Sequence, residues 1–188
     1  IKFPDFIHAM KPSPIDNVQD ANRVFDFLSS QPWATNMLTY VYGNQGVPTS
    51  YREQDGFGVH AFKLYNDKGE YKYVKFNFRS LQGVKGLNVK EAMELQGKDF
   101  NHLTNDLYKN INAGNFPKWD LYIQVLDPKD LNSFDFDPLD PTKIWPTDLV
   151  PETKVGTLTL NRMPKNFFQE TEQVAMAPGN LVPGIEPS

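Results

Sequence analysis

The sequence predicts an α+β fold, in which antiparallel strands are combined with short helices. Residues 56–80 hold two stretches of alternating apolar and polar residues around the turn 66–69, a pattern typical of a β-hairpin. Residues 119–127 and 155–164 alternate in a similar way and predict two further strands. Between the hairpin and these strands, apolar residues recur every three or four positions, which predicts helices.

The composition is that of one globular domain and argues against several classes of function. The 188 residues suffice for a sizeable core, and 39% of them are hydrophobic. A net charge of −4 argues against a nucleic-acid partner, because no basic stripe is present to neutralise phosphates. No apolar run is long enough to span a membrane, and no signal peptide opens the chain. The absence of cysteine excludes disulfides and thiolate metal sites.

We expect residues 1–188 to form a single segment in three consecutive parts. Residues 1–55 predict short helices and turns. Residues 56–127 predict the hairpin, two helices and a strand. Residues 128–188 predict a long wrapping loop rich in proline and aspartate, a last strand and a tail.

The helices are predicted from apolar spacing and from the residues that end them. Residues 20–32 predict a helix that stops at a proline, which cannot continue it. Residues 87–97 predict a helix capped by Gly97, and residues 98–117 predict one that ends at Gly114. The tail predicts a short amphipathic helix followed by proline-rich chain.

A histidine occupies an unexpected place in the hairpin. Alternation puts His60, Phe62 and Leu64 on one apolar face of the first strand. A histidine buried there would be favoured in its neutral form and would need a partner for its N–H group. Two interpretations stay open: a core histidine bonded to a backbone carbonyl, or one that organises an arginine or aspartate from a later segment.

The predicted strands leave the edges of a sheet to be covered. Twisted strands with apolar faces expose unpaired edges that a stable protein must pair or cover. The strands therefore form either a small sheet beneath the helices or half of a barrel. The chain opens on Ile1 rather than methionine, and both of its ends look cut from a longer protein. We therefore expect the half-barrel.

Motifs that carry chemistry on their own are missing. The three histidines, His8, His60 and His102, lie in different predicted elements, and none has a second ligand at metal-binding spacing. We expect no metal site built by these residues. Known nucleotide-binding, hydrolase and metalloprotease motifs do not occur. Residue pattern alone leaves the function unreadable.

Eight blocks of sequence, in order along nearly the whole chain, carry a family resemblance. They are IKFPDFIH, RxxxGFGVHAFKL from Arg52, YVKFNFRSLQGVKGL, KDFNHLTNDLY, GNFPKWDLYIQV, FDPLDPTKIWP, VGTLTLNRMPKNFFQETEQVA and PGNLVPGIEPS. Together these blocks resemble the monofunctional haem catalases. The resemblance implies an eight-stranded antiparallel barrel to which this chain supplies about half the strands, together with inserted helices and a wrapping loop. It also implies haem as cofactor and an intertwined homotetramer.

The activity implied by the resemblance is the decomposition of hydrogen peroxide to water and oxygen. In such catalases the catalytic histidine and asparagine and the iron-ligating tyrosine match positions outside this chain. We therefore expect no catalytic residue within it, and expect the segment alone to be inactive and to need the remaining catalase segments. Alternatives are a catalase-fold haem peroxidase or hydroperoxide-converting enzyme, and an inactive catalase-like fragment. The compartment stays open.

The residues that resemble the supporting shell of the haem come from three parts of the chain. Phe3 matches the phenylalanine that stacks on the haem, and Phe6 matches an aromatic residue of the substrate channel. Met176 and Pro178 fall where the family packs side chains against the haem, although phenylalanine is usual at the first position. His60 matches a histidine that hydrogen-bonds the arginine partnering the iron-bound tyrosine.

Many catalases also bind NADPH on the outer side of the barrel, through histidines and an arginine. At the matching positions this chain has Asn36, Gln45, Asp55, Asn77, Arg79 and Thr147, with Ile144 and Trp145 as an apolar wall. Loss of cations from a phosphate site removes charge-assisted hydrogen bonds of about 1.5–3 kcal/mol each. We therefore expect that this chain does not bind NADPH tightly.

Overall fold

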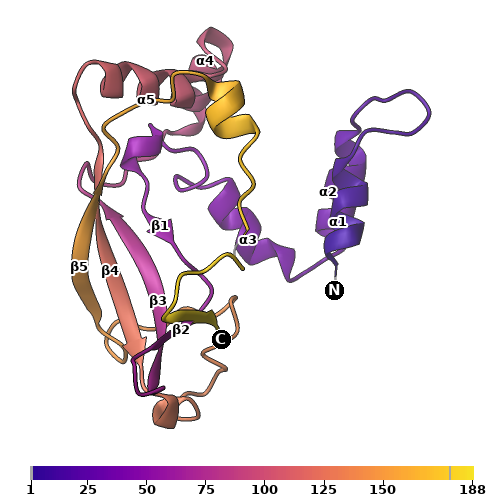
Figure 1. The fold of residues 1–188 in the computed structure, drawn as a ribbon. Coiled ribbons are helices and arrows are strands. Elements are labelled where there is room, and N and C mark those ends of the chain that lie inside the picture. The colour runs from indigo at the N-terminus through magenta and orange to yellow at the C-terminus, as the bar shows by residue number, and fades with distance from the viewer. Residues whose placement is uncertain (1, 178) are drawn as a thin grey trace.

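The computed structural model describes residues 2–177 and 179–188, which form one antiparallel sheet with helices above it and to one side (Figure 1). The predicted α+β class is confirmed. The helices are α1 (Phe3–Met10), α2 (Ala21–Ser29), α3 (Ala34–Val41), α4 (Val89–Lys98) and α5 (His102–Asn112), with the short turns η1 (Tyr51–Glu53), η2 (Pro128–Asp130) and η3 (Phe168–Glu172). The strands are β1 (Gly56–Phe57), β2 (Phe62–Tyr65), β3 (Tyr71–Ser80), β4 (Lys118–Leu126), β5 (Glu152–Thr159) and β6 (Ile185–Pro187).

The sheet has the order β5-β4-β3-β2-β6, and β1 pairs with the far end of β3 beyond β2. Strand β6 was not predicted, because three residues between prolines carry no strand pattern. It pairs with β2 through Leu64 opposite Ile185 and Phe62 opposite Pro187, and so returns the end of the chain to the hairpin (Figure 1). Among the described residues β5 and β6 are the edges of an open sheet.

The first strand of the hairpin is broken, and this corrects the placement of His60. Phe57 pairs with Asn77, and Phe62 pairs with Val74. Four residues, 58–61, therefore stand opposite only two residues of β3, and the surplus leaves the ladder as a bend. His60 lies in this bend with an exposed side chain, not on the buried face that alternation predicted.

Close backbone approach accounts for the start of the bend. The Gly58 N–H donates to Phe76 O at 2.8 Å, and a Cβ atom at Gly58 would lie 2.8 Å from that same oxygen. Only glycine fits there without displacing the backbone. The predicted turn 66–69 is confirmed, since Gly69 has a positive φ of 78° and Asn66 accepts hydrogen bonds from the Lys68 and Glu70 N–H groups.

Side-chain caps begin two of the α-helices, α2 at Asp20 and α4 at Asn88. Helix α4 begins at a capping box in which Asn88 and Glu91 each bond the other's backbone N–H. It continues through Gly97 to Lys98, so the prediction that Gly97 caps it is wrong. Gly114, with a φ of 82°, follows α5 as predicted.

Three predicted elements differ clearly in length from those observed. Helix α5 covers His102–Asn112 rather than 98–117. Strand β5 begins at Glu152 and ends at Thr159, earlier than the predicted 155–164. Its early start follows from pairing, because Glu152 lies opposite Gln124 of β4. The predicted amphipathic helix of the tail is a single π-helical turn, η3. Of the helices in the described part of the chain, none is long and apolar enough to cross a membrane.

The two faces of the sheet differ in what covers them. The loop 128–151 packs over one face and closes a core with Trp145 and Val150 from the loop, Tyr73 and Leu126 from the sheet and Ala61 from the bend before β2. The opposite face is apolar. Residues that lie directly opposite each other on neighbouring strands project from the same face, so the pairing shows which side chains meet there. On this opposite face the rings of Phe62 and Phe76 lie 6.1 Å apart, whereas Val125 and Leu158 remain exposed.

Candidate functional site

The predicted haem-stacking and channel residues lie together in an apolar groove formed by α1, α2 and α3. Phe3 and Phe6 both line this groove of about 380 Å³. Phe6 is half-buried with its ring 6.3 Å from that of Phe27, whereas Phe3 is 67% exposed. Gln31 also lines the groove, and its buried side-chain oxygen has no hydrogen-bond partner among the described residues.

The other predicted site residues are not brought into this groove. Met176 is 84% exposed on the tail, and Pro178 lies outside the described residues. His60 lies in the exposed bend before β2, and no hydrogen bond to its ring is found within the described chain. The chain therefore presents Phe3, His60 and Met176 as exposed side chains on different elements.

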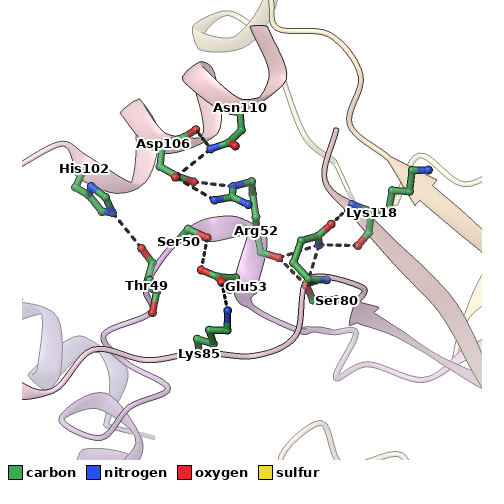
Figure 2. Close-up of polar contacts among 11 residues, drawn as sticks. Thr49, Ser50, Arg52, Glu53, Ser80, Lys85, His102, Asp106, Asn110 and Lys118 are labelled. Carbon is green, nitrogen blue, oxygen red and sulfur yellow. Dashed lines mark hydrogen bonds and ion pairs between the residues drawn. The ribbon is translucent and has the colours of Figure 1, made fainter. Parts of the chain in front are cut away.

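A polar cluster joins the end of the sheet to α5, and Figure 2 shows it. Its centre is Arg52 on η1, whose guanidinium donates twice to the Asp106 carboxylate, at 2.7 and 3.0 Å. Asn110, one helical turn after Asp106, donates to the same carboxylate at 3.1 Å. Hydrogen bonding to Asp106 raises the pKa of the Arg52 guanidinium above its ordinary value.

We call these residues the Arg52 cluster. Residues at the end of the sheet also hydrogen-bond the backbone of η1. The Arg52 carbonyl oxygen accepts from the Ser80 hydroxyl at 2.6 Å and from the Gln82 amide at 3.1 Å. Gln82 reaches on to the backbone of Lys118 at the start of β4. One arginine therefore fixes the end of β3, the start of β4 and α5 relative to one another (Figure 2).

Flanking contacts extend the Arg52 cluster to the segment before it. Buried Ser50 donates to Glu53 at 2.9 Å, and Glu53 is paired with Lys85 at 3.1 Å. His102, at the first turn of α5, contacts the Thr49 carbonyl oxygen at 3.1 Å through Nε2. His102 thereby ties α5 to the segment before η1.

A second cluster lies on the loop-covered face of the sheet, where the resemblance places NADPH. Arg79 of β3 donates to Glu152 of β5 through Nη2 at 2.6 Å and Nε at 3.3 Å, and to Asp55 through Nη1 at 3.1 Å. Asn77 donates to Glu152 at 2.9 Å and to Gln124 at 3.2 Å. We call these residues the Arg79 cluster. Hydrogen bonding to Glu152 raises the pKa of Arg79 above its ordinary value.

The residue expected as an apolar wall is part of the core instead. Trp145 is 1% exposed, and its indole N–H donates to Pro138 O at 2.8 Å. Lys75 lies beneath it, with Nζ 5.1 Å from the ring centroid and 2.8 Å from Lys143 O. Burial lowers the pKa of Lys75, although Asp140 opposes the shift. Gln124 donates to the Trp145 and Val150 carbonyl oxygens.

Partners of both arginines were missed from the sequence. Arg52 and Asp106 are 54 positions apart, and Arg79 and Glu152 are 73 positions apart. No local pattern links residues at such separations, because the pairing depends on how the strands and α5 are placed. Within the described residues, no group of three or more histidine, aspartate and glutamate side chains is arranged to hold a metal ion.

Comparison with known proteins gives a consistent result over the whole chain. The catalase family model matches residues 1–188. A catalase of Vibrio vulnificus is 65% identical over all 188 residues, which cover 37% of that relative, and a catalase of Pseudomonas aeruginosa is 62% identical, with 36% covered. The crystal structure of a fungal catalase superposes with a TM-score of 0.91 at 37% identity, covering 100% of this chain and 37% of that one. The predicted catalase-like fold is confirmed.

The Arg52 cluster generates a prediction about local stability. Asp106→Asn removes the charge that Arg52 is bonded to while keeping the side-chain shape. A hydrogen bond to a charged group contributes about 1.5–3 kcal/mol, so amide protection in α5 should fall about ten- to a hundredfold. Hydrogen exchange of the longer protein, followed by mass spectrometry, measures the amide protection of α5.

The matched control is Asp67→Asn, because Asp67 is an exposed aspartate in the hairpin turn. Its exchange pattern should equal that of the unmodified protein. Equal protection of α5 in both variants would mean that the ion pair does not hold the helix to the sheet.

Proposed function

This chain belongs to the catalase family, and from that premise we propose that it is part of a haem enzyme that decomposes hydrogen peroxide to water and oxygen. The observation that carries the proposal is the family match over residues 1–188, together with 65% identity to a curated catalase. The chain spans a little over a third of the length of the curated relatives that it matches. The proposal therefore concerns the longer protein and assigns this chain a supporting part in it.

The residues present fit the apolar surroundings of a haem. The groove of α1–α3 is lined mostly by aromatic and aliphatic side chains, and Phe3 leaves most of its ring exposed beside it. An exposed apolar surface of this kind suits a planar apolar group, whose burial it would favour by about 25 cal/mol for each Å². Phe3 would stack on haem, Met176 and Pro178 would pack against it, and Phe6 would line the approach of peroxide. Haem, when bound, supplies the iron redox chemistry of the reaction.

We assign His60 to the positioning of an arginine from elsewhere in the longer protein. Its exposed ring is free to take a partner outside the described chain, whereas a buried ring satisfied by a backbone carbonyl would not be. The resemblance makes this partner the arginine that keeps the iron-ligating tyrosine ionised. A hydrogen bond from His60 would fix the orientation of this arginine. His60 then acts through the arginine and does not itself touch peroxide.

The open sheet supports a second part of the proposal. Residues 1–188 act as one core segment whose exposed apolar face, with Phe62, Phe76, Val125 and Leu158, is covered by further strands of the barrel. Its three parts are the helices and turns of 1–55, the sheet and helices of 56–127, and the wrapping loop, last strand and tail of 128–188. The longer protein assembles as a homotetramer.

The test of the activity is oxygen release by the longer protein. We expect the Soret absorption band of protein-bound haem and rapid evolution of oxygen from hydrogen peroxide, with one oxygen released for every two peroxides. The 188-residue chain alone should bind no haem in stoichiometric amount. Consumption of peroxide only together with an added reductant or an organic hydroperoxide would indicate one of the alternative haem enzymes. Stoichiometric haem and oxygen release from the chain alone would contradict the dependence on residues outside it.

Phe3 offers a test of the haem contact with a matched control. Phe3→Ala in the longer protein should speed haem dissociation about ten- to a hundredfold, because loss of a buried phenylalanine contact costs about 1.5–3 kcal/mol. Transfer of haem to excess apomyoglobin measures the rate. Phe100→Ala should leave the rate unchanged, since Phe100 is 81% exposed before α5 and has no assigned haem contact. Equal rates in both variants would remove Phe3 from the haem site.

His60 is tested by a spectroscopic signature as well as by rate. His60→Gln should lower oxygen release by about tenfold, the lower end of the loss expected when the partner of a metal-ligand shell is removed. The haem absorption bands should shift, because the ionisation of the iron ligand changes with its arginine. An unchanged spectrum and rate would make His60 a surface residue of the bend without a positioning role.

A further inference from the structure

The Arg79 cluster occupies the place where the resemblance puts the NADPH phosphates. Arg79 is the cation among the residues at these matching positions, and its guanidinium is already engaged on both edges. Glu152 takes the Nε and Nη2 edge in a two-point contact at 3.3 and 2.6 Å, and Asp55 takes Nη1 at 3.1 Å. This is the geometry by which arginine binds a phosphate, with a carboxylate in its place.

The remaining contacts hold these carboxylates where they are. Glu152 also accepts from Asn77 at 2.9 Å, and Asp55 also accepts from the Ser80 backbone N–H at 2.8 Å. The face of the guanidinium is covered as well, since its central carbon lies 5.1 Å from the centroid of the Phe57 ring. Arg79 therefore has fixed partners at its edges and on one face.

We infer that Glu152 is a resident anion that binds Arg79 in place of a phosphate, so that the outer face of the sheet is a latent phosphate site closed by the chain's own carboxylates. The ligand class excluded is that of phosphorylated nucleotides, including NADPH. The inference concerns binding and is independent of peroxide turnover.

Charge explains why a phosphate does not displace the carboxylate. Two carboxylates and one guanidinium leave the Arg79 cluster with a net charge of −1, from one positive and two negative groups. A phosphate group would bring further negative charge beside Asp55 and Glu152. It would also have to break hydrogen bonds that are already made, so little is gained in exchange.

The expected apolar wall of Ile144 and Trp145 also lacks an exposed aromatic side chain on which the nicotinamide or adenine ring of NADPH could stack. Trp145 is 1% exposed and covers Lys75, so its ring has no free face. Ile144, the other residue of the expected apolar wall, is 84% exposed but offers no aromatic surface. NADPH therefore does not fit the residues of this surface.

The carboxylates of Asp55 and Glu152 stabilise the sheet instead. Asp55 belongs to the segment before β1, Arg79 to β3 and Glu152 to β5, and Asn77 links Glu152 to Gln124 of β4. One set of side chains thus connects β3, β4 and β5 with the segment before β1. The same contacts that close the phosphate site fix the start of β5.

The experiment compares binding of NADPH and of inorganic pyrophosphate to the longer protein at low salt, by equilibrium dialysis. The unmodified protein should show no saturable binding of either probe at micromolar concentrations. In the double variant Asp55→Asn, Glu152→Gln, pyrophosphate should bind at least about tenfold more tightly, which is 1.4 kcal/mol at 25 °C. Adding Arg79→Met should abolish the gain, because the guanidinium is then absent.

The control is Glu172→Gln, which removes one exposed carboxylate from η3 and should leave binding as in the unmodified protein. Micromolar binding of NADPH by the unmodified protein overturns the inference whether or not the variants fold. Equal pyrophosphate affinity before and after the double substitution also overturns it. Failure of oxygen release would bear on the proposed activity and leave this result intact.

Discussion

Backbone pairing along β3 and β4 is the constraint on which the rest of the structure depends. Eight residues of β3, from Tyr73 to Ser80, lie opposite eight residues of β4 in unbroken register. This register decides which side chains share a face, because a shift by one residue would exchange the faces. It places Lys75 beside Gln124 and Arg79 beside Asp120, so polar side chains gather on the face that also carries Tyr73 and Leu126 of the core. The other face is apolar.

The buried polar side chains on the loop-covered face find hydrogen-bond partners within the chain itself. Gln124, 3% exposed, donates to two carbonyl oxygens of the wrapping loop, and Lys75 donates to a third. Unpaired polar groups at this depth would be costly, so these bonds hold the loop on the sheet. A surface bound this firmly by its own loop and carboxylates has little capacity left for a ligand. In the Arg79 cluster the same holds for charged groups, because Arg79 is bonded to Asp55 and Glu152 of this chain.

The apolar face and the groove of α1–α3 are the opposite case, because both leave large hydrophobic side chains exposed. Phe3 of the groove and Leu158 of the apolar face are exposed to an extent that a finished hydrophobic core would not show. The chain therefore has one face of the sheet whose polar groups are paired within the chain. The opposite face and the groove of α1–α3 leave apolar side chains exposed.

Local patterns in the sequence determined the elements whose causes are local. The hairpin turn at Gly69, the end of α5 before Gly114 and the strand β4 were predicted because alternation, spacing and positive φ are properties of neighbouring residues. Block-by-block resemblance also determined the family. Only the tertiary structure decided the position of His60, since two surplus residues in the pairing with β3 expel it from the ladder. The same holds for Glu152 on Arg79 and for Asp106 on Arg52, because contacts across 73 and 54 positions depend on strand register and helix placement, which no local pattern encodes.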